Sequence, residues 1–432
     1  MTRGALTGQT GLPTTAAARV GLFGLIGSGN SGNEASMEVV LTYLRDNHPD
    51  AIVDAMCGGA ERVRTNYGID AIPVTWYEKY EHRTPGAPAA FLKALGKSID
   101  VVRTVSWVRR HDAVIVPGAG VLEATLPMRP WGFPYGLFLL CASGRLFRTK
   151  VALVSVGASA INQRATRWLS NSVARLAYYR SYRDIQSRDA MKQRGIDTSR
   201  DNVYPDLVFG MPTPRPDHGD AQTVGVGVMA YYGGNDDRWR AAQMHSSYVE
   251  KMTYFTRWLV DSGHRVRLFG GDSKFDDRVA EQIVADLQQY RPDLEPGWVA
   301  AEPISSFPEL LQGMNGVGTV VATRYHNVMC ALKLCKPTIA LGYSEKFVSL
   351  MADMGLSEFT QFAYSLDVDR LIEQFKEMES RHAELQRTMA ERNAANVRSL
   401  NHQFAELSAL LLPASEPALA ATEKKLARKS VR

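Results

Sequence analysis

Short apolar runs alternate with glycine-rich or polar turns and with segments of helical periodicity along most of the chain. The run at 19–25 (RVGLFGL) is followed by a loop rich in Gly, Ser and Asn, by a helical pattern over 34–47 and by a second apolar run over 51–56. This order is typical of a parallel sheet whose strands are joined by right-handed crossovers. The other elements predicted in this half are strands at 113–116, 151–156 and 184–187 and helices at 135–146 and 164–179.

A proline-rich segment without apolar periodicity, 211–222 (MPTPRPDHGDAQ), interrupts this pattern. The alternation restarts after it, so a second α/β unit is predicted, and the fold class is two doubly wound domains in tandem. The expected parts are a first Rossmann-like domain at 19–212, a linker at 213–222, a second Rossmann-like domain at 223–367 and amphipathic helices at 368–412.

The two ends of the chain differ in composition from the rest. Residues 1–18 are mostly Gly, Thr and Ala and lack the apolar stretch of a signal peptide, so we expect a disordered tail. The tail at 413–432 ends in EKKLARKSVR, which carries five basic residues. It is interpreted as a solvated tail. The alternative is weak peripheral contact with an anionic bilayer, at about 1 kcal/mol per basic residue.

Composition narrows the class of protein. The chain has 432 residues, of which 45% are hydrophobic and 22% charged, and these are ordinary globular values. A net charge of +5 slightly favours acidic small molecules or lipid surfaces and does not argue for nucleic acid. The four cysteines form no CxxC pair, which favours free thiols in a reducing compartment and a cytoplasmic protein.

The strongest candidate for chemistry is the stretch 322–327 (ATRYHN), which joins the apolar run 317–321 to a helical pattern. Arg324 and His326 lie on this turn, where a helix N-terminus also presents unpaired N–H groups. A fixed cation beside a titratable imidazole suits an anionic substrate that needs proton transfer. The structural alternative is an arginine in an ion pair and a histidine that caps or packs.

Four other turns at predicted strand ends are polar or glycine-rich, and ligands of α/β domains bind at such ends. The loop 24–34 (GLIGSGNSGNE) contains a GxGxxG spacing, but it lacks the acidic context of a dinucleotide site, with only Asp54 as a weak signal. Arg188 can bind a carboxylate or phosphate with two hydrogen bonds, or pair locally with Asp189 or Asp206. The binding residues predicted at these turns are Ser28, Gly29, Asn30 and Glu34 in the first loop, Gly118 and Gly120 in the second, Arg188 in the third, and Tyr343 and Lys346 in the fourth.

Taken in order, these stretches resemble the polysaccharide pyruvyltransferase family over about 19–365. The parts that carry the resemblance are GLIGSGNSGNE, VPGAG, VSVGAS, Ser187-Arg188-Asp189, Tyr204-Pro205-Asp206, Arg324-Tyr325-His326 and KPTIALGYSEK. Asn33 stands where the family often has an acid, and Ala119 where it often has glycine. Both departures lie where an acceptor sugar would bind.

The resemblance implies two Rossmann-like domains facing across a cleft in the GT-B arrangement. It also implies transfer of the enolpyruvyl unit of phosphoenolpyruvate to two hydroxyls of a sugar acceptor, free or lipid-linked, with no cofactor and no metal. On this basis Arg324 and Arg188 bind the donor with Lys346 as a further cation, and His326 is the general acid or base. The alternatives are a nucleotide-sugar-dependent GT-B glycosyltransferase and a non-catalytic sugar-binding relative.

Overall fold

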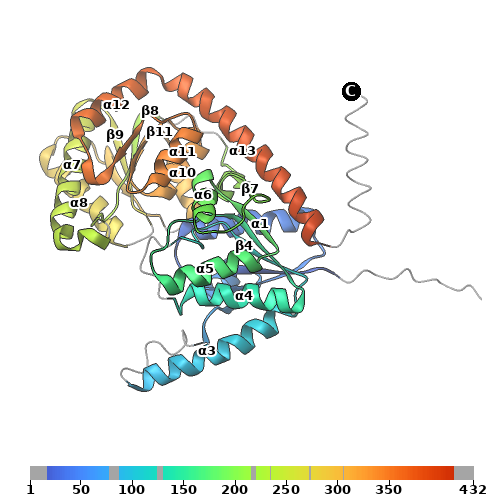
Figure 1. The fold of residues 1–432 in the computed structure, drawn as a ribbon. Helices are drawn as coiled ribbons and strands as arrows, with labels where there is room; N and C mark the ends of the chain where they lie inside the picture. Colours follow the sequence, from blue (N-terminus) through green and yellow to red (C-terminus); the bar gives the residue numbers. More distant parts are fainter. Residues whose placement is uncertain are drawn as a thin grey trace, which may run out of the picture.

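The computed structural model describes residues 17–76, 87–123, 130–215, 220–233, 235–271, 274–304 and 306–412. Most of the predicted tail at 1–18, residues 216–219 of the predicted linker and the whole basic tail at 413–432 lie outside these ranges. The described chain forms two α/β domains, each built on one parallel sheet (Figure 1). The predicted fold class is therefore confirmed.

The N-terminal sheet has the order β3-β2-β1-β4-β5-β6-β7 within the described residues, and every pairing is parallel. Its central strands are almost continuous apolar runs, as expected where helices cover both faces of a sheet. The strands are β1 (Arg19–Gly24), β2 (Ile52–Cys57), β3 (Asp70–Pro73), β4 (Ala113–Pro117), β5 (Lys150–Val156), β6 (Tyr179–Tyr182) and β7 (Asn202–Val203).

Two groups of helices cover this sheet. Helices α1 and α2, which follow β1 and β2, cover one face of the sheet. From β3 at the edge the chain then passes back over β2 and β1 to reach β4, so α3, α4 and α5 cover the other face. A cluster of buried apolar side chains that includes Trp107, Leu140 and Val173 fills the layer beneath α3–α5. The helices are α1 (Ser31–Asn47), α2 (Ala60–Tyr67), α3 (Ala87–Val108), α4 (Phe133–Phe147), α5 (Arg164–Leu176), α6 (Ile185–Gln193) and the 3-10 turn η2 (Leu207–Gly210).

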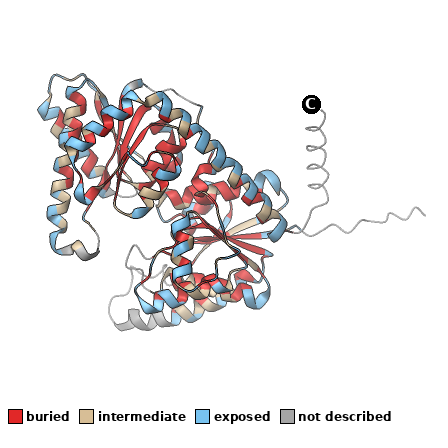
Figure 2. Cartoon of the chain, turned by 45° about the horizontal axis from the view of Figure 1, so that its top comes forward, coloured by how far each residue is buried: buried red, intermediate tan, exposed pale blue. Residues whose placement is uncertain are grey.

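The C-terminal sheet has the order β10-β9-β8-β11-β12-β13 in the described part of the chain and is also parallel. Its strands are β8 (Asp220–Gly227), β9 (Arg265–Phe269), β10 (Val299–Glu302), β11 (Val317–Ala322), β12 (Thr338–Gly342) and β13 (Thr360–Phe362). Its helices are η3 (Asn235–Arg240), α7 (Ala241–Asp261), α8 (Lys274–Tyr290), α9 (Phe307–Asn315), α10 (Tyr325–Lys333), α11 (Glu345–Asp353) and η4 (Ala363–Ser365). In both domains the strands are buried and the outer helix faces are exposed (Figure 2).

The two last helices, α12 (Val368–Ser380) and α13 (His382–Leu411), follow the second domain, and α13 runs from it across the first (Figure 1). The side chain of Asn393 donates a hydrogen bond to the carbonyl of Leu332 in the C-terminal domain, at 2.8 Å. Ten residues later, fully buried Gln403 donates to Ser181 Oγ on β6 at 2.7 Å. The same helix therefore makes hydrogen bonds to both domains.

One predicted strand is wrong. Residues 184–187 form the N-cap and first turn of α6, because Asp184 Oδ1 accepts the N–H of Ser187 at 2.6 Å, and the strand of this region is β6. The predicted helix at 164–179 correspondingly ends at Leu176, so the chain reaches the sheet edge five residues earlier than expected. This shift changes which arginine stands at the strand end.

Candidate active site

A cavity of about 560 Å³ lies between the two domains, and the residues that line it follow the carboxyl ends of strands in both sheets. From the N-terminal domain it is lined by Asn30, Gly32, Asn33, Ser36, Ala119, Gly120, Glu123, Arg183, Asp206 and Val208. From the C-terminal domain it is lined by Met229, Ala230, Tyr231, Tyr232, Gly233, Arg324, Tyr325, His326, Tyr343, Ser344 and Lys346.

Arg324 follows β11 and occupies the N-cap position of α10. Its Nε and Nη2 donate to the two carboxylate oxygens of Asp276, at 2.8 and 2.7 Å. Asp276 is fully buried, and its Oδ1 also accepts the N–H of Ala230 at 2.8 Å. Charge-assisted pairs of this two-point kind fix a guanidinium in its plane. Arg324 is thus a pre-oriented cation on the cavity wall.

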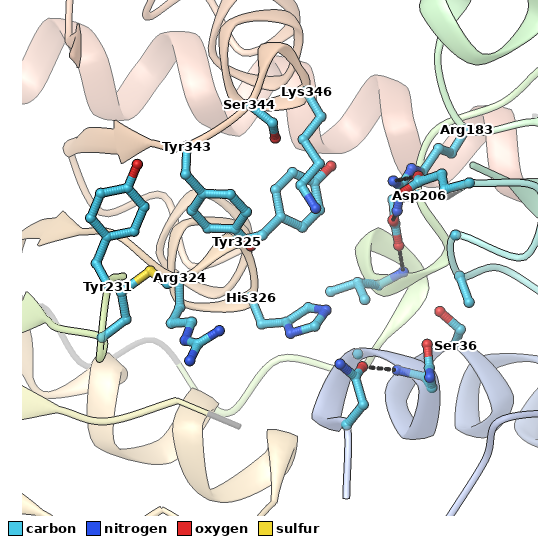
Figure 3. Close-up of a pocket in the computed structure, with 18 of the residues that line it drawn as sticks. Ser36, Arg183, Asp206, Tyr231, Arg324, Tyr325, His326, Tyr343, Ser344 and Lys346 are labelled. Carbon is cyan, nitrogen blue, oxygen red and sulfur yellow. Dashed lines mark hydrogen bonds and ion pairs between the residues drawn. The ribbon is translucent and has the colours of Figure 1, made fainter. Parts of the chain in front are cut away.

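His326 lies in the first turn of α10, and its imidazole points across the cavity towards α1 of the other domain (Figure 3). A Cβ atom built on Gly32, in the first turn of α1, would lie only 1.9 Å from His326 Nε2. The absence of a side chain at Gly32 therefore makes room for the ring. The imidazole is placed at a helix N-terminus, whose N–H groups favour an anion beside it.

Arg183 follows β6 directly and lies on the opposite wall, with its side chain almost fully buried. Its guanidinium pairs with Glu123 and lies 3.5 Å from Asp184 and 3.7 Å from Asp206. Burial alone would lower the pKa of Arg183, but Glu123 and its neighbouring anions outweigh burial and raise that pKa. Its guanidinium carbon also lies 5.5 Å from the ring centre of Tyr325, so it faces the C-terminal domain.

Lys346 lies in the first turn of α11, with its Nζ 4.7 Å from the ring centre of Tyr325 and 5.4 Å from that of Tyr343. Burial lowers the pKa of Lys346 to about 8, and the nearby positive charge of Arg183 adds to this effect. An ammonium group that has lost most of its water is strongly attracted to any anion that enters. The cavity thus carries arginines on both walls with a lysine between aromatic rings.

The predicted site residues divide into two groups. Those that line the cavity are Asn30, Gly120, Arg324, His326, Tyr343 and Lys346. Those that do not line it are Ser28, Gly29, Glu34, Gly118 and Arg188.

The residues that do not line the cavity make contacts within their own domain. Ser28 Oγ donates to the carbonyl of Leu25 at 2.6 Å, and Gly29 has a φ of +92° in the same turn. Glu34 is buried and pairs with Arg62 at 3.4 Å.

Gly118 and Arg188 complete that group. A Cβ atom on Gly118 would lie 2.6 Å from Ser36 Oγ, so this glycine permits close packing against α1. Arg188 lies on the outer part of α6 with a partly exposed side chain, and its closest acidic oxygen is that of Asp189 at 4.0 Å. The prediction that Arg188 faces Arg324 across the cleft is wrong in position, because Arg183 occupies that place.

Several residues that line the cavity were not predicted as site residues, among them Arg183, Glu123 and Asp206. Asp276, which holds Arg324 but does not line the cavity, was not predicted either. The signal for Arg183 was present in the tetrapeptide Tyr179–Tyr182 that precedes it, because a half-aromatic run of this kind favours a strand. No local signal marks Asp276, since it lies 48 residues from the arginine that it orients. Within the described ranges, no group of three or more His, Cys, Asp and Glu side chains is arranged to hold a metal ion.

A family model described as polysaccharide pyruvyl transferase matches residues 30–345. A search of curated proteins finds no match. Among solved structures, a putative UDP-N-acetylglucosamine 2-epimerase from Listeria monocytogenes superposes with a TM-score of 0.60 at 11% identity, covering 93% of this chain and 99% of that one. UDP-GlcNAc 2-epimerase from Neisseria meningitidis, bound to UDP-GlcNAc, gives a TM-score of 0.58 at 10% identity, with coverages of 90% and 98%. At such identities the likeness concerns the fold, which is the GT-B-like arrangement of two facing domains.

Proposed function

This chain belongs to the polysaccharide pyruvyl transferase family, and on that premise we propose that it transfers the enolpyruvyl unit of phosphoenolpyruvate onto two hydroxyls of one sugar. The product is a pyruvate ketal on a polysaccharide or on its lipid-linked precursor. The observation that carries this proposal is the meeting of Arg324, His326 and Lys346 from one domain with Arg183 from the other around a single cavity.

The donor has a phosphate and a carboxylate on one small frame, so its binding requires more than one cation. Arg324 and Arg183 are each held by buried carboxylates, which fix their donor groups before the ligand arrives. Lys346 adds a third positive charge on the wall that carries Tyr325 and Tyr343. Hydrogen bonds to charged groups contribute roughly 1.5–3 kcal/mol each. Two or three of them are therefore enough for a donor Kd in the micromolar to millimolar range.

The chemistry requires two proton movements. The methylene carbon of the donor gains a proton and becomes a methyl group, the bond between C2 and the phosphate oxygen breaks, and two sugar oxygens bond to C2. Of the two hydroxyl protons lost by the sugar, one balances the proton gained by the methyl group and the other leaves with the phosphate. His326 is the side chain we assign to these transfers, since an imidazole both gives and accepts protons near neutral pH.

Water is the natural competitor of the sugar hydroxyls. The cavity lies between two domains, whose walls reduce the access of water to the reactive C2 centre. Glu123 and Asp206 line the wall near Arg183, and their carboxylate oxygens suit hydrogen bonds from an acceptor sugar. We therefore place the donor between Arg324, Lys346 and Arg183, and the acceptor next to it on the N-terminal side of the cavity.

The test is incubation of the protein with phosphoenolpyruvate and candidate glycans, with release of inorganic phosphate and the glycan mass measured together. The proposal expects phosphate release coupled to the mass gain of a pyruvate ketal, and loss of both in a His326→Asn variant. Release of a nucleoside diphosphate from a nucleotide sugar would instead identify a glycosyltransferase. A folded protein that gives no heat on titration with phosphoenolpyruvate would identify a non-catalytic relative.

A further inference from the structure

The helices α3, α4 and α5 carry an unusual distribution of charge. Between Glu123 and Asp184 the sequence contains no acidic residue, while it contains nine basic ones. Two of these, Arg180 and Arg183, are engaged in ion pairs with Asp201 and Glu123. The basic residues of α4, α5 and the ends next to them are Arg145, Arg148, Lys150, Arg164, Arg167 and Arg175, and all of them are exposed or partly exposed.

Large apolar side chains are exposed on the same helices. Leu146 at the end of α4 is 72% exposed, Val102 on α3 is 69% exposed and Trp168 on α5 is 60% exposed. Trp131 just before α4 and Phe147 at its end are also exposed. Single exposed apolar residues are normal, but several of them among arginines on neighbouring helices form a surface of mixed character.

These residues belong to one continuous surface, which we call the α3–α5 face. Helix α4 packs against α3 on one side and against α5 on the other (Figure 1). The ring of Phe138 on α4 lies 5.4 Å from that of Trp168, and the guanidinium of Arg109 lies 5.0 Å from the ring of Phe147. The acidic residue within α3, Asp100, is buried and paired with basic neighbours, so it leaves the face positive.

We propose that the α3–α5 face is a docking surface for an anionic lipid bilayer. Exposed tryptophan and leucine side chains enter the headgroup region of a bilayer, and arginines beside them attract anionic headgroups. In the described part of the chain no helix is both long and apolar enough to cross a bilayer, so contact takes place at the surface. This inference does not depend on the proposed reaction.

Charge argues against two other occupants of this face. A second copy of the chain would place one arginine-rich face against another. The chain's own C-terminal segment begins beside the face, because Lys150 Nζ donates to the carbonyl of Leu410 near the end of α13 at 2.7 Å. The sequence 413–432 has five basic residues and two acidic ones, so its net charge has the same sign as that of the face and does not favour it as the occupant.

The test is co-sedimentation of the full-length protein with vesicles of equal parts phosphatidylglycerol and phosphatidylcholine, and with vesicles of phosphatidylcholine alone. One variant removes apolar contact (Leu146→Ser with Trp168→Ser) and a second removes charge (Arg145→Gln with Arg167→Gln). A matched control changes an exposed tryptophan and an exposed arginine of the C-terminal domain (Trp239→Ser with Arg278→Gln). A fourth variant replaces the basic residues of the tail by glutamine.

We expect the wild type and the matched control to bind the anionic vesicles and not the neutral ones. Each α3–α5 variant should bind at least about tenfold more weakly, with unchanged circular dichroism and melting temperature. Absence of binding by the wild type would overturn the proposal. Unweakened binding of anionic vesicles by both face variants would also overturn it. If only the tail variant lost vesicle binding, the contact would belong to the tail and not to the face. If the wild type bound no vesicles but did bind an acidic protein through the α3–α5 face, the face would be a protein interface instead.

Discussion

The imidazole of His326 occupies the space where a side chain at Gly32 would begin, with 1.9 Å between Nε2 and a Cβ built on that glycine. These residues belong to different domains, so this close approach exists only while the two domains face each other. A Gly32→Ala protein should fold but displace the ring. We expect its kcat to fall by roughly a hundredfold, because small misplacements of a catalytic group are costly. Steady-state kinetics measure this effect.

Gly58 provides the control for that variant. A Cβ at Gly58 would meet its nearest neighbour at 3.6 Å, which is an ordinary contact. Gly58→Ala should therefore keep near-parental kcat. If Gly32→Ala also kept it, the assignment of His326 to proton transfer at this position would be contradicted.

The pair Arg324–Asp276 should matter for both stability and donor binding. In Asp276→Asn the guanidinium loses its charged partner, so we expect the free energy of unfolding to fall by about 2 kcal/mol. The KM for phosphoenolpyruvate should rise, since Arg324 would no longer be held in its plane. Denaturant unfolding and initial-rate kinetics measure the two effects.

A second arginine–aspartate pair supplies the comparison. Arg257 donates to both oxygens of Asp286 at 2.9 and 2.7 Å, but this pair is partly exposed and does not line the cavity between the domains. Asp286→Asn should change stability by less than about 1 kcal/mol and leave KM unchanged. Equal effects of the two variants on KM would argue against a positioning role for Asp276.

Substitutions of Arg183 and Arg188 test which of the two arginines binds the donor. Arg183→Gln should raise the KM for phosphoenolpyruvate by roughly tenfold or more, since one charge-assisted contact with the donor is lost. Arg188→Gln should have little effect, because its side chain does not line the cavity. Arg183→Lys keeps a cation among the carboxylates and serves as the folded control. The reverse order of effects would restore Arg188 as the donor ligand.

The pH dependence of donor binding should follow Lys346. Its pKa is lowered to about 8 by burial, with a further contribution from Arg183, so the ammonium is present at pH 7 and mostly lost at pH 9. A phosphate monoester is already doubly ionised in this range, as its second pKa is about 6. The KM for phosphoenolpyruvate should therefore rise by about tenfold from pH 7 to pH 9. Kinetics across this range measure it.

Lys333 is the matched control for that profile. Burial also lowers its pKa to about 8, but it lies outside the cavity lining and donates to the carbonyl of Phe209 at 2.8 Å. The rise of KM should disappear in Lys346→Met and persist in Lys333→Met. Both lysines are more protonated in the unfolded chain, so each should make stability rise with pH between about 8 and 10.5.

The fold class followed from the sequence because parallel strands and crossover helices leave strong periodic signals. The run 113–116 and the pattern around 317–328 were placed within one or two residues, since buried apolar runs end sharply at polar turns. The stretch Arg324–His326 was found for the same reason. The close approach of His326 to Gly32 left no such signal, since it depends on the packing of two domains.

The misplaced arginine shows where local patterns fail. The sequence pattern predicts a strand at Asp184–Ser187, whereas Asp184 caps α6 and the strand is Tyr179–Tyr182, two of whose four residues are aromatic. Moving the strand end by five residues exchanges Arg188 for Arg183. The carboxylates that hold Arg183 come from positions 60 residues before and 23 residues after it, so only the tertiary structure brings them together.

We propose above that the cavity between the domains binds phosphoenolpyruvate and that His326 moves protons during transfer of the enolpyruvyl unit. The most direct measurement is the yield of pyruvate ketal on an acceptor glycan, by mass spectrometry, for the wild type and for His326→Asn at saturating donor. We expect a ketal product with the wild type, and at most a trace with His326→Asn although that variant still binds the donor by calorimetry. Equal yields from both proteins would contradict it.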